Sequence, residues 1–182
     1  LAGFGLQVGR PLAPMLAQSA ADLPTALERA GPAAVEWKLD GVRIQVHRDG
    51  EDVAVFTRTL DEVTDRLPEV VEAVRALPAR TLVLDGEAIA LRPDGRPLPF
   101  QVTAARAARR DVPSAQAAIP ISTRLFDLLH ADGVDLLDRG AQERREALGG
   151  HLPQRRTTSR PLVLPGESSY DAAKRGSGKQ QV

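Results

Sequence analysis

The chain contains no cysteine among its 182 residues, which excludes disulfides, thiol catalysis and cysteine metal sites. Its three histidines, His47, His130 and His151, lie far apart and lack the spacing of a zinc site. No apolar run is long enough to cross a bilayer. The N-terminus also lacks the basic start and the apolar segment of a secretory signal. These absences are compatible with a cytoplasmic protein.

Neither sign of charge is in excess, because 24 Lys and Arg balance 24 Asp and Glu. A protein that holds nucleic acid by bulk attraction alone is usually more basic. Lysine is scarce and occurs only at Lys38, Lys174 and Lys179. Arginine stays protonated at ordinary pH, whereas a desolvated lysine can become a nucleophilic amine. Any lysine chemistry must therefore use one of these three positions.

The apolar share of 42% and the charged share of 26% are those of a globular domain. The length suits a single domain over residues 1–182. Because the sequence begins with Leu1 and not with Met, we expect it to be a piece of a longer protein. The abundance of arginine over lysine is a weak indication of a bacterium with GC-rich coding.

Hydrophobic periodicity predicts an α+β fold with largely antiparallel sheets flanked by helices. The expected helices are Leu23–Ala30, Leu60–Leu77, Gln101–Arg109 and Ala141–Leu148. The expected strands are Ala34–Leu39, Val42–His47, Val53–Thr57, Thr81–Leu91 and Ile119–Leu129. Gly- and Asp-containing turns separate several of these segments, and after His151 the pattern no longer predicts an element.

The segment EWKLDGVR, residues 36–43, places Lys38 at the end of one expected strand and Asp40–Gly41 at the turn into the next. Gly41 permits close backbone approach or an unusual turn angle. If Lys38 is buried beside cations or apolar walls, its neutral amine can attack a phosphorus. A K-x-D-G match alone is more often a hairpin with a solvated lysine.

Further segments of the sequence favour the functional interpretation of Lys38 over the solvated one. The K-x-D-G segment resembles the first motif of the covalent nucleotidyltransferases, the superfamily of ATP-dependent DNA ligases, RNA ligases and mRNA capping enzymes. FTRT at 56–59, LDGE at 84–87 and LFDLL at 125–129 are similar to the motifs that follow it. GRPLAPMLA at 9–17 and PFQ at 99–101 resemble DNA ligases in particular. The resemblance covers most of residues 12–148.

The resemblance implies that Lys38 is the residue to which AMP becomes attached. Glu36 would then help to read the adenine edge, and Arg43 would lie near the ribose and the phosphate of a nick. On structural grounds alone, Glu36 could be an exposed strand residue. Arg43 could lie on the solvated face of its alternating strand.

The same resemblance implies nucleotide contacts for three later residues. Arg58 would contact phosphate with its donor fork, Glu87 would accept a hydrogen bond from a ribose hydroxyl, and Phe126 would stack on the adenine. Each has a purely structural alternative. Arg58 could be an ordinary ion-pair partner, and Phe126 could pack in a core. Asp85–Gly86 could be only a hairpin turn that leaves Glu87 on the surface.

The resemblance implies a DNA ligase adenylation domain that uses ATP and Mg²⁺ and acts on nicked double-stranded DNA, in DNA repair, replication and recombination. It also implies other domains of the same ligase chain, including a C-terminal oligonucleotide-binding (OB) domain that is absent here. Two later motifs depart from the family pattern. Gly166–Glu167 has the wrong order for the fourth motif, and Gln181 stands where the first lysine of the fifth motif would be. The alternatives are an RNA ligase or capping enzyme, or a non-catalytic module that binds nicked DNA.

Overall fold

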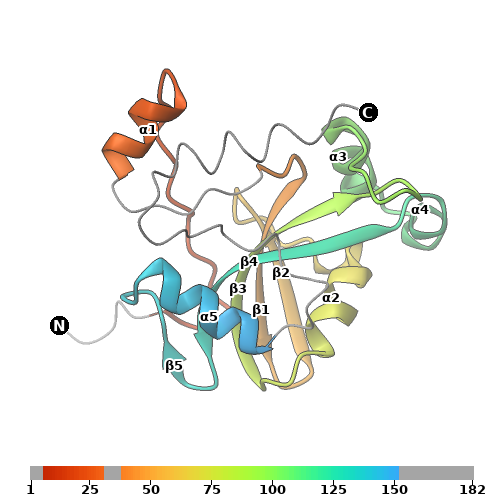
Figure 1. Ribbon diagram of the computed structural model, residues 1–182. Coiled ribbons are helices and arrows are strands. Elements are labelled where there is room, and N and C mark those ends of the chain that lie inside the picture. Colours follow the sequence, from red (N-terminus) through yellow and green to blue (C-terminus); the bar gives the residue numbers. More distant parts are fainter. Residues whose placement is uncertain (1–5, 31–37, 152–182) are drawn as a thin grey trace. The chain divides into compact units, whose positions relative to one another are not determined.

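The computed structural model describes residues 6–30 and 38–151 (Figure 1). It divides into two compact units, one of Leu1–Pro14 with Leu39–Thr157 and one of Met15–Lys38 with Thr158–Val182. The second unit contains α1 (Leu23–Ala30), which confirms the first expected helix. The side chain of Asp22 caps α1, because its Oδ1 accepts a hydrogen bond from the Thr25 amide at 2.9 Å. A single domain over residues 1–182 stays a prediction.

The first unit is built on a five-stranded antiparallel sheet in the order β2-β1-β3-β4-β5 (Figure 1). The strands are β1 (Val42–Asp49), β2 (Asp52–Thr57), β3 (Thr81–Ala90), β4 (Ile121–Ala131) and β5 (Val134–Asp135). The expected α+β fold with antiparallel sheets is thereby confirmed. Gly50 adopts a φ of 61° at the tight turn between β1 and β2.

In the described part of the first unit, four α-helices accompany the sheet: α2 (Pro68–Arg75), α3 (Phe100–Ala108), α4 (Val112–Ala118) and α5 (Ala141–His151). The expected helices near α3 and α5 are confirmed within a few residues. Both α4 and the short strand β5 were not predicted. The expected strand Ala34–Leu39 is wrong at its C-terminal end, since Lys38 and Leu39 lie outside any strand. Its residues 34–37 lie outside the described part.

The expected helix over Leu60–Leu77 is also wrong in its first half. The helix begins only at Pro68, after the short 3₁₀ helix η1 (Thr64–Arg66). Proline disfavours helical geometry in the preceding residue, and Leu67 has φ −126° and ψ 57°. Val63, although apolar at helical spacing, donates its amide to the Val55 carbonyl at 2.8 Å. Tertiary packing onto β2 therefore replaces the first helical turns.

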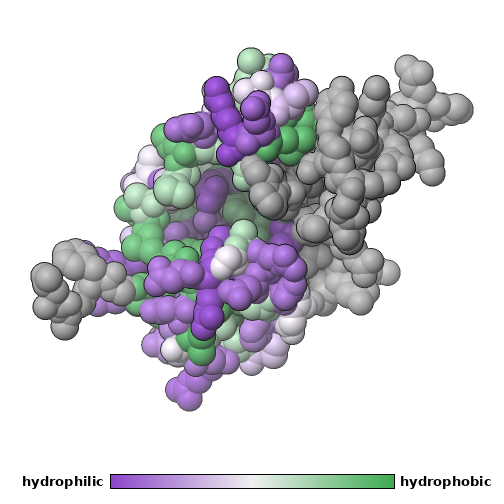
Figure 2. Space-filling view, turned by 60° about the vertical axis from the view of Figure 1, so that its left-hand side comes forward, coloured by the Kyte–Doolittle hydropathy of each residue, from purple (hydrophilic) through white to green (hydrophobic). Residues whose placement is uncertain are grey.

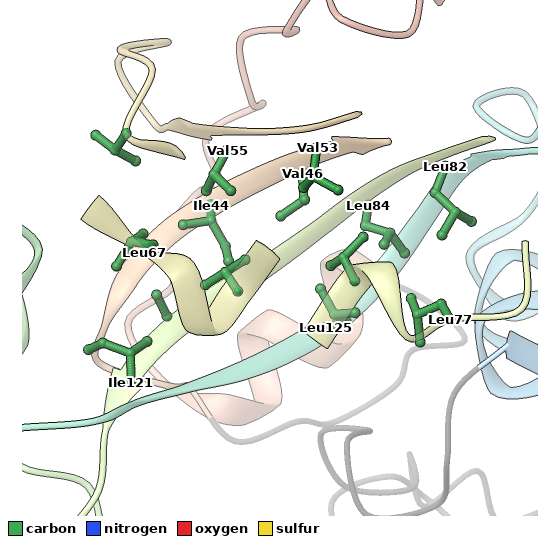
Figure 3. Packing of buried hydrophobic residues seen from close by; sticks show 14 of the residues in the cluster. Ile44, Val46, Val53, Val55, Leu67, Leu77, Leu82, Leu84, Ile121 and Leu125 are labelled. Carbon is green, nitrogen blue, oxygen red and sulfur yellow. The ribbon is translucent and has the colours of Figure 1, made fainter. Parts of the chain in front are cut away.

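The apolar core lies between the sheet and α2. Figure 3 shows the side chains of Ile44, Val46, Leu82 and Leu84 on the face of the strands that α2 covers. Val70 and Val74 of α2 are also fully buried. Burying one aliphatic side chain of this size contributes roughly 1.5–3 kcal/mol. This face fixes the register of the strands, because a shift by one residue would turn the apolar side chains outward.

The opposite face of β1 is not solvated, although the alternating sequence predicts a half-buried strand. Gln45 is 6% exposed and His47 is 1% exposed. The segment around Gly9–Leu12 binds both side chains. The Gly9 amide donates to His47 Nδ1 at 2.9 Å, and the Leu12 amide donates to Gln45 Oε1 at 2.8 Å. The first residues of the GRPLAPMLA segment (9–17), which resembles DNA ligases, thus cover this face of the sheet.

Hydrophilic and hydrophobic areas alternate over the visible surface of the described residues (Figure 2). Within residues 6–30 and 38–151, none of the helices combines the length and the apolar character needed to span a bilayer. The large apolar side chains exposed in the first unit, among them Leu60, Phe100 and Val134, come from separate elements. Scattered exposed apolar residues of this kind are ordinary in globular proteins.

We predict that His47 makes the folded state less stable in acid. Burial lowers the pKa of His47 from 6.5 to about 4, so between these values only the unfolded chain binds the proton. Stability from this group is complete above pH 6.5 and falls by ~1.4 kcal/mol per pH unit below it. The measurement is chemical denaturation of the wild type and of His47→Gln from pH 7.5 to 4.5. An equally steep pH dependence in His47→Gln would contradict the prediction.

Candidate functional site

Three neighbouring strands bring charged residues together on the sheet face that lies opposite the apolar core. Arg43 of β1 pairs with Glu87 of β3, and Gln45 pairs with Asp85. Asp85 pairs in turn with Asp127 of β4. Because side chains alternate between the faces of a strand, the odd-numbered positions 43, 45, 85 and 87 share one face. Residues far apart in the sequence thus meet at one site.

Arg43 is held by two contacts of different kinds. Its Nε donates to Asp85 Oδ1 at 2.9 Å and its Nη2 donates to Asp85 Oδ2 at 2.5 Å. Its guanidinium carbon lies 4.8 Å from the centre of the Phe126 ring, which is a cation–π distance. The hydrogen bonds to Asp85 raise the pKa of Arg43, and the charges of Asp85, Glu87 and Asp127 add to this effect against partial burial.

Phe126 lies at an irregularity of the β3–β4 pairing. The register shifts between Asp85 and Gly86, so Asp127 opposes Asp85 and Leu125 opposes Gly86, while Phe126 has no cross-strand partner. An unpaired extra residue of this kind changes the direction of the neighbouring side chains. Leu125 remains in the core at 2% exposure. The Phe126 ring, by contrast, contacts the guanidinium of Arg43.

Glu87 binds the K-x-D-G segment directly, since its Oε1 accepts a hydrogen bond from the Gly41 amide at 3.0 Å. The backbone approaches β3 so closely here that a Cβ on Gly41 would lie 2.4 Å from the Ala88 carbonyl oxygen. Gly86 is equally confined, because its Cβ would lie 2.6 Å from the Arg124 carbonyl oxygen. Both glycines are therefore required by packing and not by a turn.

The structure thus brings Arg43, Glu87 and Phe126 together. The alternative of Asp85–Gly86 as a hairpin turn is wrong, because both residues are buried inside β3. The alternative that Arg43 lies on a solvated face is also wrong, since its side chain is only 36% exposed and forms an ion pair with Asp85.

Of the other three predicted residues, the structure describes Arg58 and Lys38. Arg58 is exposed in the loop that follows β2, and Lys38 is exposed and is the last residue of the first segment of the second unit. Glu36 lies outside the described residues, as do the segments compared with the fourth and fifth motifs. Sequence reasoning missed Asp85 as the partner of Arg43. An acidic residue two positions before Glu87 in the largely apolar strand LVLDGEAIA was the available signal.

Solved structures share this fold. The ligase domain of Mycobacterium tuberculosis LigD aligns with a TM-score of 0.53 and 27% identity over 78% of this chain and 44% of that one. A structure described as mycobacterial DNA ligase D complexed with ATP and MES aligns with a TM-score of 0.52 and 28% identity, with the same coverage of both chains. The fold is accordingly that of a ligase nucleotidyltransferase domain.

Sequence comparison identifies the family. Residues 14–174 match the model of the ATP dependent DNA ligase domain, and the chain belongs to this family. A probable DNA ligase of Streptomyces griseus is 57% identical over 90% of this chain. One of Mycobacterium marinum is 56% identical over 94% of it. The chain spans 32% and 34% of these two relatives, about a third of their length.

We predict that Gly86→Ala destabilises the first unit. The added methyl group meets a backbone oxygen, which only a shift of β3 or β4 can relieve, and overpacking of this kind costs about 1–3 kcal/mol. Gly149→Ala is the matched control, because no atom lies within 4 Å of its new Cβ and the residue is in α5. Thermal unfolding should show a lower midpoint for Gly86→Ala and an unchanged or higher midpoint for the control.

We also predict that Asp85→Asn destabilises the fold by ~1–2 kcal/mol, because it leaves the partly buried Arg43 without its charged partner. Asp94→Asn serves as the control. Its ion pair with Arg96 is exposed and spans 3.7 Å, so its loss should cost roughly 0–0.5 kcal/mol. Equal free energies of unfolding for the two variants would show that the Arg43–Asp85 pair stabilises the fold no more than an exposed ion pair does.

Proposed function

We propose that this chain forms a covalent AMP adduct on Lys38 from ATP and passes the AMP to the 5′-phosphate of nicked double-stranded DNA. The observation that carries the proposal is the hydrogen bond from the Gly41 amide to Glu87, which joins the lysine motif to the polar site on the sheet. Lys38 precedes Gly41 by three residues in the chain. The family match and the ligase structures support the same reaction.

The site residues would divide the work of holding the nucleotide. Adenine would stack on the face of the Phe126 ring that Arg43 does not cover, as aromatic platforms commonly do. A carboxylate has several lone-pair positions. Glu87 can therefore accept a ribose hydroxyl in addition to the Gly41 amide. Arg58, exposed after β2, is suited to bind phosphate with its planar donor fork, and Glu36 would read the adenine edge.

In the first step the unprotonated Nζ of Lys38 would attack the α-phosphorus of ATP. A phosphorus–nitrogen bond forms, the bond to the pyrophosphate oxygen breaks, and the lysine amine loses a proton. In the second step an oxygen of the DNA 5′-phosphate would attack the same phosphorus. The phosphorus–nitrogen bond then breaks, and the lysine nitrogen takes up a proton and leaves as the free amine. Arg43 would stabilise the phosphate charge in this step. Positioning and charge neutralisation dominate catalysis at phosphorus.

We propose that the reaction requires Mg²⁺ together with ATP. Among residues 6–30 and 38–151, no three or more His, Cys, Asp or Glu side chains form a group suited to a metal ion. We therefore assign no protein ligand to the ion. Mg²⁺ is commonly bound through substrate phosphates and one or two carboxylates, and loss of adduct formation in EDTA would test the requirement.

We propose that sealing of the nick also uses parts of the ligase outside this chain. The chain covers about a third of its curated relatives, so we propose that other domains of the same ligase complete the reaction and clasp the DNA. The named relatives are bacterial. We propose that this protein acts on DNA in the cytoplasm of a bacterium.

We predict that Lys38→Ala and Lys38→Arg abolish the AMP adduct in the full-length protein, because neither variant has an amine that can lose its proton. The measurement is intact mass after incubation with ATP and Mg²⁺, followed by peptide mapping. Arg96→Ala, which removes a cation whose side chain is 80% exposed, is the control and should form the adduct normally. Denaturation-resistant AMP on Lys38→Ala would refute the assignment. GTP preference or RNA end joining would indicate a capping enzyme or RNA ligase instead.

A further inference from the structure

Asp127 creates an electrostatic problem beside the candidate site. It lies directly opposite Asp85 in the β3–β4 pair, and like charges in opposed positions destabilise a sheet. Asp85 is 7% exposed and is paired with Arg43. A second carboxylate at this position would compete with Asp85 for the guanidinium of Arg43, unless another cation neutralises it.

Arg144 of α5 is that cation. Its Nε donates to Asp127 Oδ1 at 2.8 Å and its Nη2 donates to Asp127 Oδ2 at 2.9 Å, a bidentate pair. Its Nη1 donates to the Arg139 carbonyl at 2.7 Å, which fixes the third arm of the guanidinium. The Arg144 and Asp127 side chains are 19% and 24% exposed, so solvent screens this pair only in part.

The residue that Arg144 holds is the direct neighbour of Phe126 in the chain. Asp127 follows Phe126 at the register shift of β4, and its Oδ1 additionally accepts the Leu128 amide at 3.0 Å. The carboxylate is thus held from both the helix and its own strand. The Phe126 ring, which directly precedes this anchored residue and has no cross-strand partner, lies 4.8 Å from the Arg43 guanidinium.

We propose that Arg144 is a positioning residue for nucleotide binding. By neutralising Asp127, it leaves Arg43 on Asp85 and the Phe126 ring aligned for adenine. This inference rests on the proposed function, but it concerns a residue outside every motif that indicated that function. Arg144 itself touches neither nucleotide nor DNA in this role.

The test is ATP affinity in the full-length protein, measured by calorimetry in a Lys38→Ala background so that no adduct forms. Arg144→Met should weaken ATP binding about tenfold, within the range of coupling between contacting residues. The double variant Arg144→Met/Asp127→Asn should return to within about threefold of the parent, because it also removes the uncompensated carboxylate. Arg139→Met is the control, since Arg139 contributes only its backbone oxygen to the contact.

A structural role of Arg144 predicts a different result. If the arginine only docks α5 onto β4, the double variant binds ATP as weakly as Arg144→Met, and both lose thermal stability together. That outcome, or a binding constant for Arg144→Met equal to that of Arg139→Met, overturns the inference. If the protein with Lys38 intact binds ATP but forms no AMP adduct, the proposed function alone is overturned. Absence of ATP binding overturns both.

Discussion

A buried carboxylate in the middle of the sheet, Asp85, is the group on which the candidate site depends. Removing a charge from water is costly unless a partner and hydrogen bonds compensate it. Arg43 provides both through its two donors. Once Arg43 is fixed in this way, its guanidinium lies over Phe126. The neighbouring Asp127 then requires a cation of its own, which α5 supplies.

The two faces of the sheet satisfy opposite physical demands. One face is apolar and packs on α2, where the loss of water contact provides most of the stabilisation. The other face is polar but also largely covered, so Gln45 and His47 must find partners in the Gly9–Leu12 segment. This arrangement fixes the charged side chains at β1 and β3 before any ligand binds. Such preorganisation lowers the cost of binding a nucleotide.

The glycines of the two motifs have a common physical reason. Gly41 and Gly86 both lie where a side chain would enter the backbone of a neighbouring strand. Because the chain approaches so closely at Gly41, its amide reaches the carboxylate of Glu87. The K-x-D-G and L-D-G-E segments are therefore in direct contact in space. Their order in the sequence indicated a common family but did not indicate this contact.

The sequence by itself determined the antiparallel α+β class, most strands to within a few residues, and the family. These depend on local periodicity and on motif order, which need no tertiary information. Tertiary structure alone decided that the segment before Pro68 packs onto β2 and that the polar face of β1 is covered. It also decided that Asp85 binds Arg43 and that Arg144 binds Asp127. These are pairings between distant elements, and their energies depend on register and burial, which no local pattern contains.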